Sequence, residues 1–400
     1  MKTAVIGAGA SGLVAAIYAA KNGEVVLIEK NNISGKKLLI TGNGRCNYFN
    51  SDMNINHYYP NNNLNEIINE NNIKEILSFF ENIGIAPYIK DGYYYPLSNK
   101  AISVKNALVK EAKLENVKFE NNFDVEKIEK KDKFIIHSKD KQIKADKVIL
   151  ALGGKSYPKT GSTGKGYEIL KAFNHQVIDP LPALVPLVTE KKYNWAGARA
   201  KVKLTLKENE NIIKEETGEV QFTSYGISGI CTFNLSILVS KELSNNKKIS
   251  INFLNNLNLN TKEEVLNYLN KRDEKVSGRT IKELLDSLLE DKLLNVIFKE
   301  TNINEDKYYS ELNNKEKHKL AENLVDFNLK IIETKSFDQA QTKIGGVSLD
   351  EINTKTMESK KQKDMYVVGE LLDVTGDCGG YNLAFAFITG MLAGKGINND

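Results

Sequence analysis

The sequence contains few cysteines and histidines, and these residues are scattered. Three cysteines (Cys46, Cys231 and Cys378) and four histidines occur among 400 residues. The cysteines form no CxxC pair, so the sequence favours neither a disulfide framework nor a zinc cluster. No two histidines have the spacing of metal ligands, so we interpret them as structural and expect no metal site. Together these features favour a reducing, cytoplasmic compartment.

Long apolar runs and an excess of one charge sign are also lacking. No apolar run reaches the ~18 residues that a membrane-spanning helix needs, so we expect no membrane partner. Glycines interrupt the apolar part of the opening stretch MKTAVIGAGASGL, and we therefore expect no signal peptide. With 55 basic and 51 acidic side chains the net charge is +4. This balance gives no reason to expect a nucleic-acid partner.

The first thirty residues carry a clear pattern. The β-branched runs TAVI (3–6) and VVLI (25–28) flank a helical stretch over 11–22. The sequence GAGASG, residues 7–12, lies between the first run and the helix, which is the context of a dinucleotide-binding fingerprint. Glu29 ends the second run, where it can accept hydrogen bonds from ribose hydroxyls. The pattern predicts a bound dinucleotide, but it does not distinguish FAD from NAD.

A second glycine-rich stretch, SGKKLLITGNGRCNYFN, follows at residues 34–50. A flavin nucleotide is long enough to need a second loop over its phosphates and ribityl chain, whereas a plain NAD domain does not need one. On composition alone, a solvated basic turn remains the alternative. The hydrogen-bond donors of this loop are Lys36, Lys37, Thr41, Gly42, Asn43 and Arg45.

The middle of the chain reads differently from its two ends. The proline-rich stretch PLPALVPL (180–187) is typical of a domain exit. Strand-like runs follow it, and a helical block extends from about residue 260. Strand and glycine patterns return at about residue 340. We therefore predict an FAD-binding domain from residues 1–187 and 335–400, a β-rich insert over 188–259 and a helical insert over 260–334.

The stretch MYVVGELLDVTGDCGGYNLAFAFITG, residues 365–390, combines an apolar run, an acidic glycine-rich bend and a second apolar run. This order is typical of a cofactor-binding strand, loop and helix. We interpret it as the second half of the N-terminal domain, whose strand rejoins the first sheet. Glu370 and Asp373 would then reach the ribityl hydroxyls. The helix from Tyr381 would point its N-terminus at the flavin.

Several long motifs, in chain order, resemble the bacterial BaiN-like flavoproteins. They include GAGASGLVAA, GKKLLITGNGRCN, ALGGKSYPKTGSTGKGY, GEVQFTSYGISG and VGELLDVTGDCGGYNLAFA. Members of that family carry names such as aminoacetone oxidase and dehydro-bile-acid reductase, and their FAD fold resembles, more distantly, fumarate reductase flavoproteins. The resemblance implies an α/β fold. Its Rossmann-type FAD-binding domain is made from both chain ends and interrupted by an insert with a β-rich, barrel-like part and a helical part.

The resemblance also implies cofactor positions in this chain. They comprise the first turn, the ribose acid, the second loop, a backbone position for the adenine, and the strand ends and helix start around the flavin. They fall on Gly7, Gly9, Ser11, Gly12, Glu29, Lys37, Asn43, Gly44, Arg45, Cys46, Asn47, Val125, Gly153, Gly154, Gly369, Glu370, Asp373, Gly380, Tyr381 and Asn382. Family members commonly have histidine at Ser224, so the resemblance supports no acid–base role there.

These features predict an FAD-dependent oxidoreductase that moves hydride between flavin N5 and a small organic substrate. Candidate substrate anchors are Arg45, Tyr225 and Lys343, each of which could instead bind cofactor or pack. Because no second GxGxxG is followed by an acid, NAD(P)H is a candidate transient reductant without a domain of its own. The alternatives are a structural or RNA-modification-linked flavoprotein in a complex, and an amine or aminoketone oxidase using oxygen. Substrate identity and oligomeric state stay open.

Overall fold

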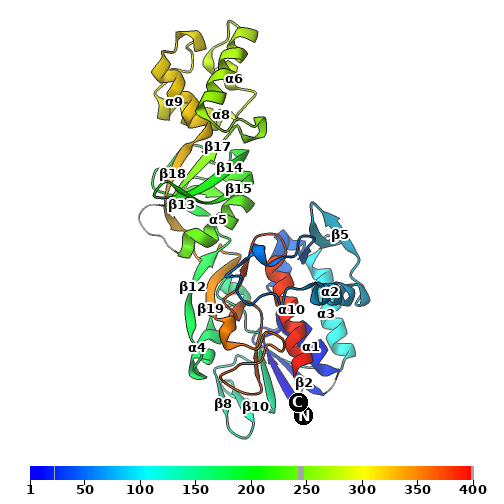
Figure 1. The fold of residues 1–400 in the computed structure, drawn as a ribbon. Helices are drawn as coiled ribbons and strands as arrows, with labels where there is room; N and C mark the ends of the chain where they lie inside the picture. Colours follow the sequence, from blue (N-terminus) through cyan, green and yellow to red (C-terminus); the bar gives the residue numbers. More distant parts are fainter. Residues whose placement is uncertain (22, 242–246, 398–400) are drawn as a thin grey trace. The chain divides into compact units, whose positions relative to one another are not determined.

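The computed structural model describes residues 1–21, 23–241 and 247–397 (Figure 1). The chain divides into two compact units. The first consists of Met1–Pro182 and Phe337–Asp400, and the second of Ala183–Ser336. Each unit has its own apolar core. None of the helices within the described ranges is long and apolar enough to cross a membrane.

A parallel sheet forms the centre of the first unit, with strand order β20-β11-β1-β2-β7. The C-terminal strand β20 pairs with β11, with Tyr366 opposite Ile149, so the C-terminal stretch rejoins the first sheet as predicted. The β-branched runs are buried, as expected for a parallel sheet that is covered on both faces. The strands are β1 (Lys2–Ile6), β2 (Glu24–Glu29), β7 (Lys118–Asn121), β11 (Lys147–Leu150) and β20 (Met365–Val367).

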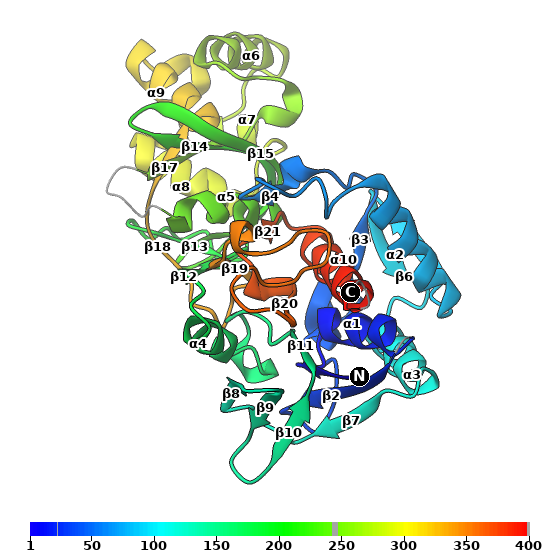
Figure 2. The same ribbon diagram turned by 60° about the horizontal axis from the view of Figure 1, so that its bottom comes forward.

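Two helices from opposite ends of the chain pack side by side in this unit (Figures 1 and 2). They are α1 (Ala10–Ala20) and α10 (Tyr381–Gly396). A Cβ atom on Gly394 would lie 2.6 Å from the Cβ of Tyr18, and one on Gly390 would lie 2.4 Å from the main-chain oxygen of Ser11. Only glycine permits so close an approach. The contact therefore ties the C-terminal helix to the fingerprint helix.

Smaller elements complete the first unit (Figure 2). Antiparallel sheets have the orders β10-β9-β8 and β3-β6-β5, and two-stranded sheets join β12 to β19 and β21 to β4. The helices are α2 (Glu70–Asn82), α3 (Ala101–Leu114) and α4 (Lys165–Ala172). The strands are β3 (Phe49–Asn50), β4 (Tyr58–Tyr59), β5 (Pro87–Lys90), β6 (Tyr93–Pro96), β8 (Lys127–Lys130), β9 (Phe134–His137), β10 (Gln142–Ala145), β12 (Val177–Ala183), β19 (Thr342–Val347) and β21 (Thr375–Gly376).

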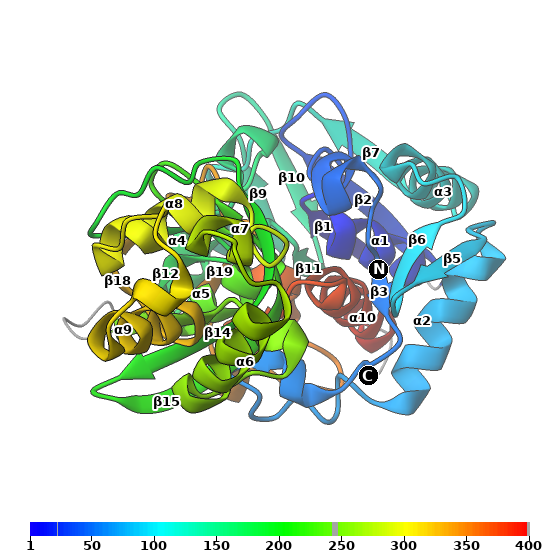
Figure 3. The ribbon, with the colours of Figure 1, turned by 90° about the horizontal axis from the view of Figure 1, so that it is seen from above.

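The second unit is built on a closed barrel with strand order β13-β16-β15-β14-β17-β18. Its helices α6 to α9 gather at one end of the barrel (Figures 1 and 3). The strands are β13 (Leu187–Thr189), β14 (Arg199–Glu208), β15 (Asn211–Phe222), β16 (Gly226–Ser228), β17 (Lys247–Asn252) and β18 (Phe327–Thr334). The helices are α5 (Ile230–Lys241), α6 (Lys262–Lys275), α7 (Ile281–Leu285), α8 (Asp291–Thr301) and α9 (Asn314–Val325).

One predicted limit of the insert needs correction. The helical insert is predicted to extend to residue 334, but residues 327–334 form β18, which pairs with β17 and β13 and closes the barrel. Phe327, Leu329 and Ile331 are buried while the residues between them are exposed, which is the period of a strand. This alternation was masked in the sequence by the neighbouring helical pattern. The two compact units divide at 182/183 and 336/337, a few residues from the predicted limits of 187 and 335, and the limit between the β-rich and helical inserts stays a proposal.

Candidate functional site

The turn between β1 and α1 contains the fingerprint glycines. Gly7 has a φ of +103°, and a Cβ atom there would lie 2.3 Å from the main-chain oxygen of Ala151. A Cβ atom on Gly12 would lie 1.8 Å from the oxygen of Gly7. A Cβ atom on Gly9, in contrast, would meet no atom within 4 Å. The first two glycines therefore allow close packing, whereas Gly9 faces open space.

The same turn leaves the start of α1 without a side-chain cap. The N-cap residue is Gly9, which has no side chain that could accept a hydrogen bond from the first turn. The N–H groups of a first helical turn have no partner within the helix and carry the positive end of its dipole. Open space in front of such donors suits a pyrophosphate group. Ser11, in this first turn, is 6% exposed.

Glu29, at the end of β2, is held beside this turn. Its Oε2 accepts a hydrogen bond of 2.9 Å from the N–H of Ala8. Its Oε1 accepts from the main-chain N–H and the side-chain amide of Asn31, at 2.8 and 2.7 Å. A carboxylate has about four acceptor positions, so capacity remains for a ribose hydroxyl. The structure thus orients Glu29 through Asn31, a residue that sequence reasoning missed.

The second glycine-rich loop has an unusual backbone. Within Leu38–Gly44, two short 3₁₀ turns are separated by a kink with non-helical backbone at Thr41, Gly42 and Asn43, and Asn43 and Cys46 have φ values of +56° and +60°. Cys46 is fully buried, which raises the pKa of its thiol to about 12, so the thiol stays protonated at neutral pH. Asn43, Gly44 and Arg45 are exposed, and Asn47 is half-buried. The Arg45 guanidinium lies 4.8 Å from the ring centre of Tyr95.

Lys37 and Glu370 form an ion pair between the second loop and the C-terminal stretch. Lys37 Nζ lies 2.8 Å from Glu370 Oε2 and donates to Ser156 Oγ at 2.6 Å. Glu370 also accepts hydrogen bonds from the hydroxyls of Ser156 and Thr342, at 3.3 and 3.2 Å. Burial on its own would raise the pKa of Glu370, but Lys37, with smaller effects of Lys343 and Thr342, more than offsets this and the pKa is lowered. Glu370 is therefore an anion whose partners come from three other segments.

The structure contradicts the predicted substrate-anchoring role of Lys343. Its side chain is fully buried, and its ammonium group donates to the main-chain oxygens of Gly345 and Leu372. Burial lowers the pKa of Lys343 to about 8. The nearby Asp373 is 7% exposed and accepts a 2.8 Å hydrogen bond from the N–H of Gly345. An ammonium group enclosed by protein atoms cannot contact a substrate, so Lys343 acts in packing.

The start of α10 resembles the start of α1, because it also has a glycine N-cap and no side-chain cap. Gly380, the N-cap residue, has a φ of +98°, and a Cβ atom there would lie 2.4 Å from the main-chain oxygen of Phe49. The amide of Asn382 accepts from the N–H of Gly376 at 2.9 Å and donates to its oxygen at 2.8 Å. Tyr381 is 5% exposed. The first-turn N–H groups of α10 again have no side-chain cap.

The other predicted cofactor positions lie at strand ends of the first unit. A Cβ atom on Gly153 (φ +73°) would lie 3.0 Å from Ser162 Oγ, and one on Gly369 (φ +65°) would lie 2.8 Å from the Oγ of Ser11. Gly154 packs against the Lys343 side chain. Val125 is 4% exposed, and its main-chain N–H and C=O have no hydrogen-bond partner among the residues that the structure describes. Such free groups suit an adenine edge.

Tyr225 lies in the second unit, between β15 and β16, whereas Arg45 lies in the first. Lys335 Nζ lies 4.0 Å from the centre of the Tyr225 ring. Lys192 Nζ donates to the main-chain oxygen of Tyr225 at 3.3 Å and to that of Thr189 at 3.1 Å. The adjacent Ser224 is exposed. Two ammonium groups thus lie around this tyrosine.

His57, which the sequence analysis interpreted as structural, belongs to a polar cluster at the start of α10. Its Nδ1 lies 3.1 Å from Asp377 Oδ2, and its Nε2 lies 2.9 Å from Asp52 Oδ2. Its ring stacks on Tyr381 with a centroid distance of 4.4 Å. Because His57 and Asp377 are 320 residues apart, no spacing in the sequence could have revealed the cluster.

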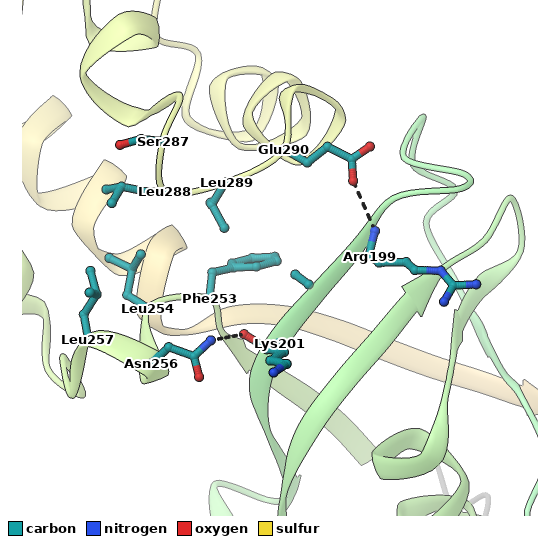
Figure 4. Close-up of a pocket in the computed structure, with 11 residues that line it drawn as sticks. Arg199, Lys201, Phe253, Leu254, Asn256, Leu257, Ser287, Leu288, Leu289 and Glu290 are labelled. Carbon is teal, nitrogen blue, oxygen red and sulfur yellow. Dashed lines mark hydrogen bonds between the residues drawn. The ribbon is translucent and has the colours of Figure 1, made fainter.

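A cavity of about 240 Å³ lies within the second unit (Figure 4). Its lining is mixed, with the apolar side chains of Phe253, Leu254 and Leu289 beside polar residues such as Asn256 and Ser287. At its edge, the Glu290 carboxylate accepts a 3.2 Å hydrogen bond from the N–H of Arg199. None of the predicted site residues lines this cavity.

The chain matches a known family along nearly its whole length. The family described as "HI0933-like protein Rossmann domain" matches residues 1–396. The chain is 35% identical to a 3-dehydro-bile acid delta(4,6)-reductase of Clostridium scindens, over 98% of this chain and 97% of that protein. It is 27% identical to a ribosomal RNA dihydrouridine synthase of Escherichia coli, over 96% and 94% of the two chains. The predicted resemblance to BaiN-like flavoproteins is confirmed.

Two solved structures share the fold. A flavocytochrome c3 fumarate reductase superposes with a TM-score of 0.51 at 15% identity, covering 99% of this chain and 78% of that one. A 3-ketosteroid-delta4-(5alpha)-dehydrogenase from Rhodococcus jostii gives 0.51 at 13% identity, covering 99% and 96%. These likenesses confirm the predicted Rossmann-type FAD-binding fold.

Proposed function

Because the chain belongs to the HI0933-like Rossmann family and is an FAD-dependent oxidoreductase, we propose that it reduces a carbon–carbon double bond conjugated to a carbonyl group. Bound FAD would supply the hydride, from flavin N5, and a small organic molecule would be the substrate. The observation that carries this proposal is the 35% identity, over 98% of the chain, to a relative named 3-dehydro-bile acid delta(4,6)-reductase. A delta(4,6) double-bond system next to a 3-keto group is a conjugated enone.

The residues of the first unit fit FAD. The first-turn N–H groups of α1 face the open space at Gly9 and would hold the pyrophosphate. Glu29 would accept from the adenosine ribose, and the free main-chain groups of Val125 would bind the adenine. The loop from Asn43 to Asn47 would lie over the dinucleotide. When bound, FAD supplies the hydride chemistry.

The first-turn N–H groups of α10 would stabilise negative charge at the pyrimidine end of the flavin. Glu370 shares its oxygens with Lys37, Ser156 and Thr342. We therefore propose that the Lys37–Glu370 pair shapes this end of the site, and that Asp373 reaches the ribityl chain as the sequence predicted. Gly153, Gly154 and Gly369 would allow the backbone to approach the cofactor.

We propose that Tyr225 anchors the carbonyl oxygen of the substrate. Hydride addition to an enone places negative charge on that oxygen, and a phenol O–H can donate to it. The ammonium groups of Lys335 and Lys192, near the Tyr225 ring and main-chain oxygen, add positive charge. Arg45, exposed on the second loop, is the second proposed anchor. We propose NAD(P)H as the transient reductant and the cytoplasm as the location.

A second candidate function is the reduction of uridine in RNA. Two relatives, 27% and 28% identical over 96% of this chain, are named ribosomal RNA dihydrouridine synthase. The uracil double bond is also conjugated to a carbonyl group, so one hydride-transfer chemistry serves both substrates. The net charge of only +4 is small for an RNA-binding chain. We therefore rank the small molecule first, in agreement with the sequence prediction.

One experiment separates these functions. The flavin is reduced under anaerobic conditions with NADH or NADPH, and its reoxidation is followed after addition of a 3-keto-4-ene steroid, unmodified ribosomal RNA or oxygen. Rapid reoxidation by the enone, with a saturated product, supports the first proposal. Reoxidation by RNA alone supports the second, and reoxidation by oxygen alone indicates an oxidase. Failure of all three acceptors would refute both proposals.

The substrate anchor is tested by replacing Tyr225 with Phe. We expect kcat/KM for the enone to fall about 100-fold, as for the loss of one oxyanion donor, while the flavin spectrum is unchanged. The matched control is Lys330→Gln on β18, whose lysine pairs with Glu190 in the same unit. An unchanged kcat/KM in Tyr225→Phe would refute the anchor without refuting enone reduction.

A further inference from the structure

His57 is placed so that both of its ring nitrogens face carboxylate oxygens. Nδ1 lies 3.1 Å from Asp377 Oδ2 and Nε2 lies 2.9 Å from Asp52 Oδ2. An ionised carboxylate only accepts hydrogen bonds, and a neutral imidazole has a single N–H. Both hydrogen bonds therefore form together only when the ring carries a proton on each nitrogen. The geometry is that of an imidazolium between two anions.

The same histidine supports the first residue of α10. Its ring stacks on Tyr381 with an interplanar angle of 21°. Its main-chain oxygen accepts a 2.8 Å hydrogen bond from the N–H of Asp377. His57 thus contacts Asp377 through its main-chain oxygen and its Nδ1 atom, and Tyr381 through its ring face. The Asp377 side chain is 10% exposed and that of Asp52 is 70% exposed, so the inner hydrogen bond is the better shielded one.

Neighbouring contacts extend this attachment along residues 375–381. Strands β4 and β21 pair, with Tyr58 opposite Gly376 (Figure 2). The hydroxyl of Tyr58 donates to the main-chain oxygen of Tyr381 at 3.1 Å. The Asn50 amide donates to the oxygen of Gly379 at 2.9 Å. Among the contacts to residues 375–381, the one between His57 and Asp377 involves a carboxylate, so it is charge-assisted when the ring carries both protons.

We propose that His57, as an imidazolium clamped between Asp52 and Asp377, is a positioning residue that orients the start of α10 toward the flavin. The clamp itself does not depend on the proposed function, but its effect on FAD does. Among the residues that the structure describes, the titratable groups in contact with the ring are Asp52, Asp377 and Tyr381. The hydrogen bond from His57 also holds the pKa of Asp52 below its usual value.

The protonation state is tested directly by nitrogen NMR of the histidine rings in the full-length protein at pH 7.5, where an isolated imidazole is largely neutral. We expect His57 to show protons on both nitrogens. The internal control is His137, which faces a single carboxylate, Glu129, at 3.3 Å, so that a ring protonated on one nitrogen satisfies its contact. In the Asp52→Asn, Asp377→Asn double variant, His57 should become neutral. A neutral His57 in the unaltered protein would overturn the proposal.

The positioning role is tested by FAD binding to apoprotein, measured by flavin fluorescence. We expect His57→Gln to weaken FAD binding about tenfold, equal to about 1.4 kcal/mol, and Asp52→Asn to weaken it less. The matched control, His137→Gln, should bind FAD like the unaltered protein. If His57→Gln is folded by circular dichroism and binds FAD normally, the positioning role is refuted. If the unaltered protein binds no FAD, the proposed function fails while the NMR result still decides the clamp.

Discussion

The starts of α1 and α10 are built alike but are held by different parts of the chain. Each has a glycine N-cap, no side-chain cap and a nearby glycine with positive φ. The start of α1 is shaped mainly by the contiguous motif of residues 7–12, to which Glu29 and Ala151 add contacts. The start of α10 depends on residues 49–58, which contact it across more than 300 residues of sequence. Two similar helix starts thus differ in how much of their support comes from residues near them in the sequence.

We expect the largest effect from a substitution at the start of α10. In Gly380→Val, a β-branched residue would have to adopt φ +98° with its Cβ 2.4 Å from the oxygen of Phe49. We expect the free energy of unfolding to fall by about 3 kcal/mol or more, with loss of FAD retention. Thermal unfolding and the flavin-to-protein absorbance ratio after gel filtration measure both effects. Unchanged FAD affinity would show that this helix start is not part of the cofactor site.

A substitution at the start of α1 should weaken FAD binding without changing the stability of the fold. In Gly9→Val the new side chain enters open space. The free energy of unfolding of the apoprotein should therefore stay within about 0.5 kcal/mol of the value for the unaltered chain. FAD affinity should fall about 100-fold or more because the side chain fills the position of the pyrophosphate. Titration of both apoproteins with FAD tests this. Equal affinities would place the pyrophosphate elsewhere.

The ion pair between the two halves of the site should have an intermediate effect. Lys37→Met leaves the Glu370 carboxylate without its cation, and both side chains are 20% exposed. We expect the apoprotein to lose about 2 kcal/mol of unfolding free energy at pH 7.

The double variant Lys37→Met, Glu370→Gln serves as the control, and it should lose less than the two single changes combined. Strict additivity in denaturant unfolding would argue against a direct interaction. Because the pKa of Glu370 is lowered on folding, its contribution is present above the unfolded pKa and is lost as pH falls through the folded value.

The smallest effect concerns another distant contact in the first unit. His175 Nδ1 lies 2.7 Å from Glu351 and Nε2 lies 2.8 Å from Ser359 Oγ. Burial lowers the pKa of His175 more than Glu351 raises it. Below the unfolded pKa of about 6.5, the unfolded chain binds a proton more readily, so stability should decline as pH falls. Thermal unfolding from pH 8 to 5 should show this decline, and His175→Gln should flatten it. If the pH dependence of thermal stability is the same in His175→Gln, His175 is not its source.

Much of the first unit was predictable because its signals are contiguous. The strand–glycine–helix–strand pattern of residues 3–29 specifies a parallel β1–β2 pair, and the structure contains it. The C-terminal stretch was predicted to rejoin that sheet, and β20 does so. In the second unit, β18 was missed because its alternation follows directly after helical residues.

The side-chain partners were predictable only in part. The spacing of Gly7, Gly9 and Gly12 determines a turn, because the steric demands of a tight turn act between near neighbours in the chain. Nothing in the order of residues reveals that Lys37 meets Glu370 or that Lys343 is enclosed. Nor does it reveal that His57 lies between Asp52 and Asp377. Charge pairing and burial depend on distances in space, and those distances are set when distant segments pack into one core.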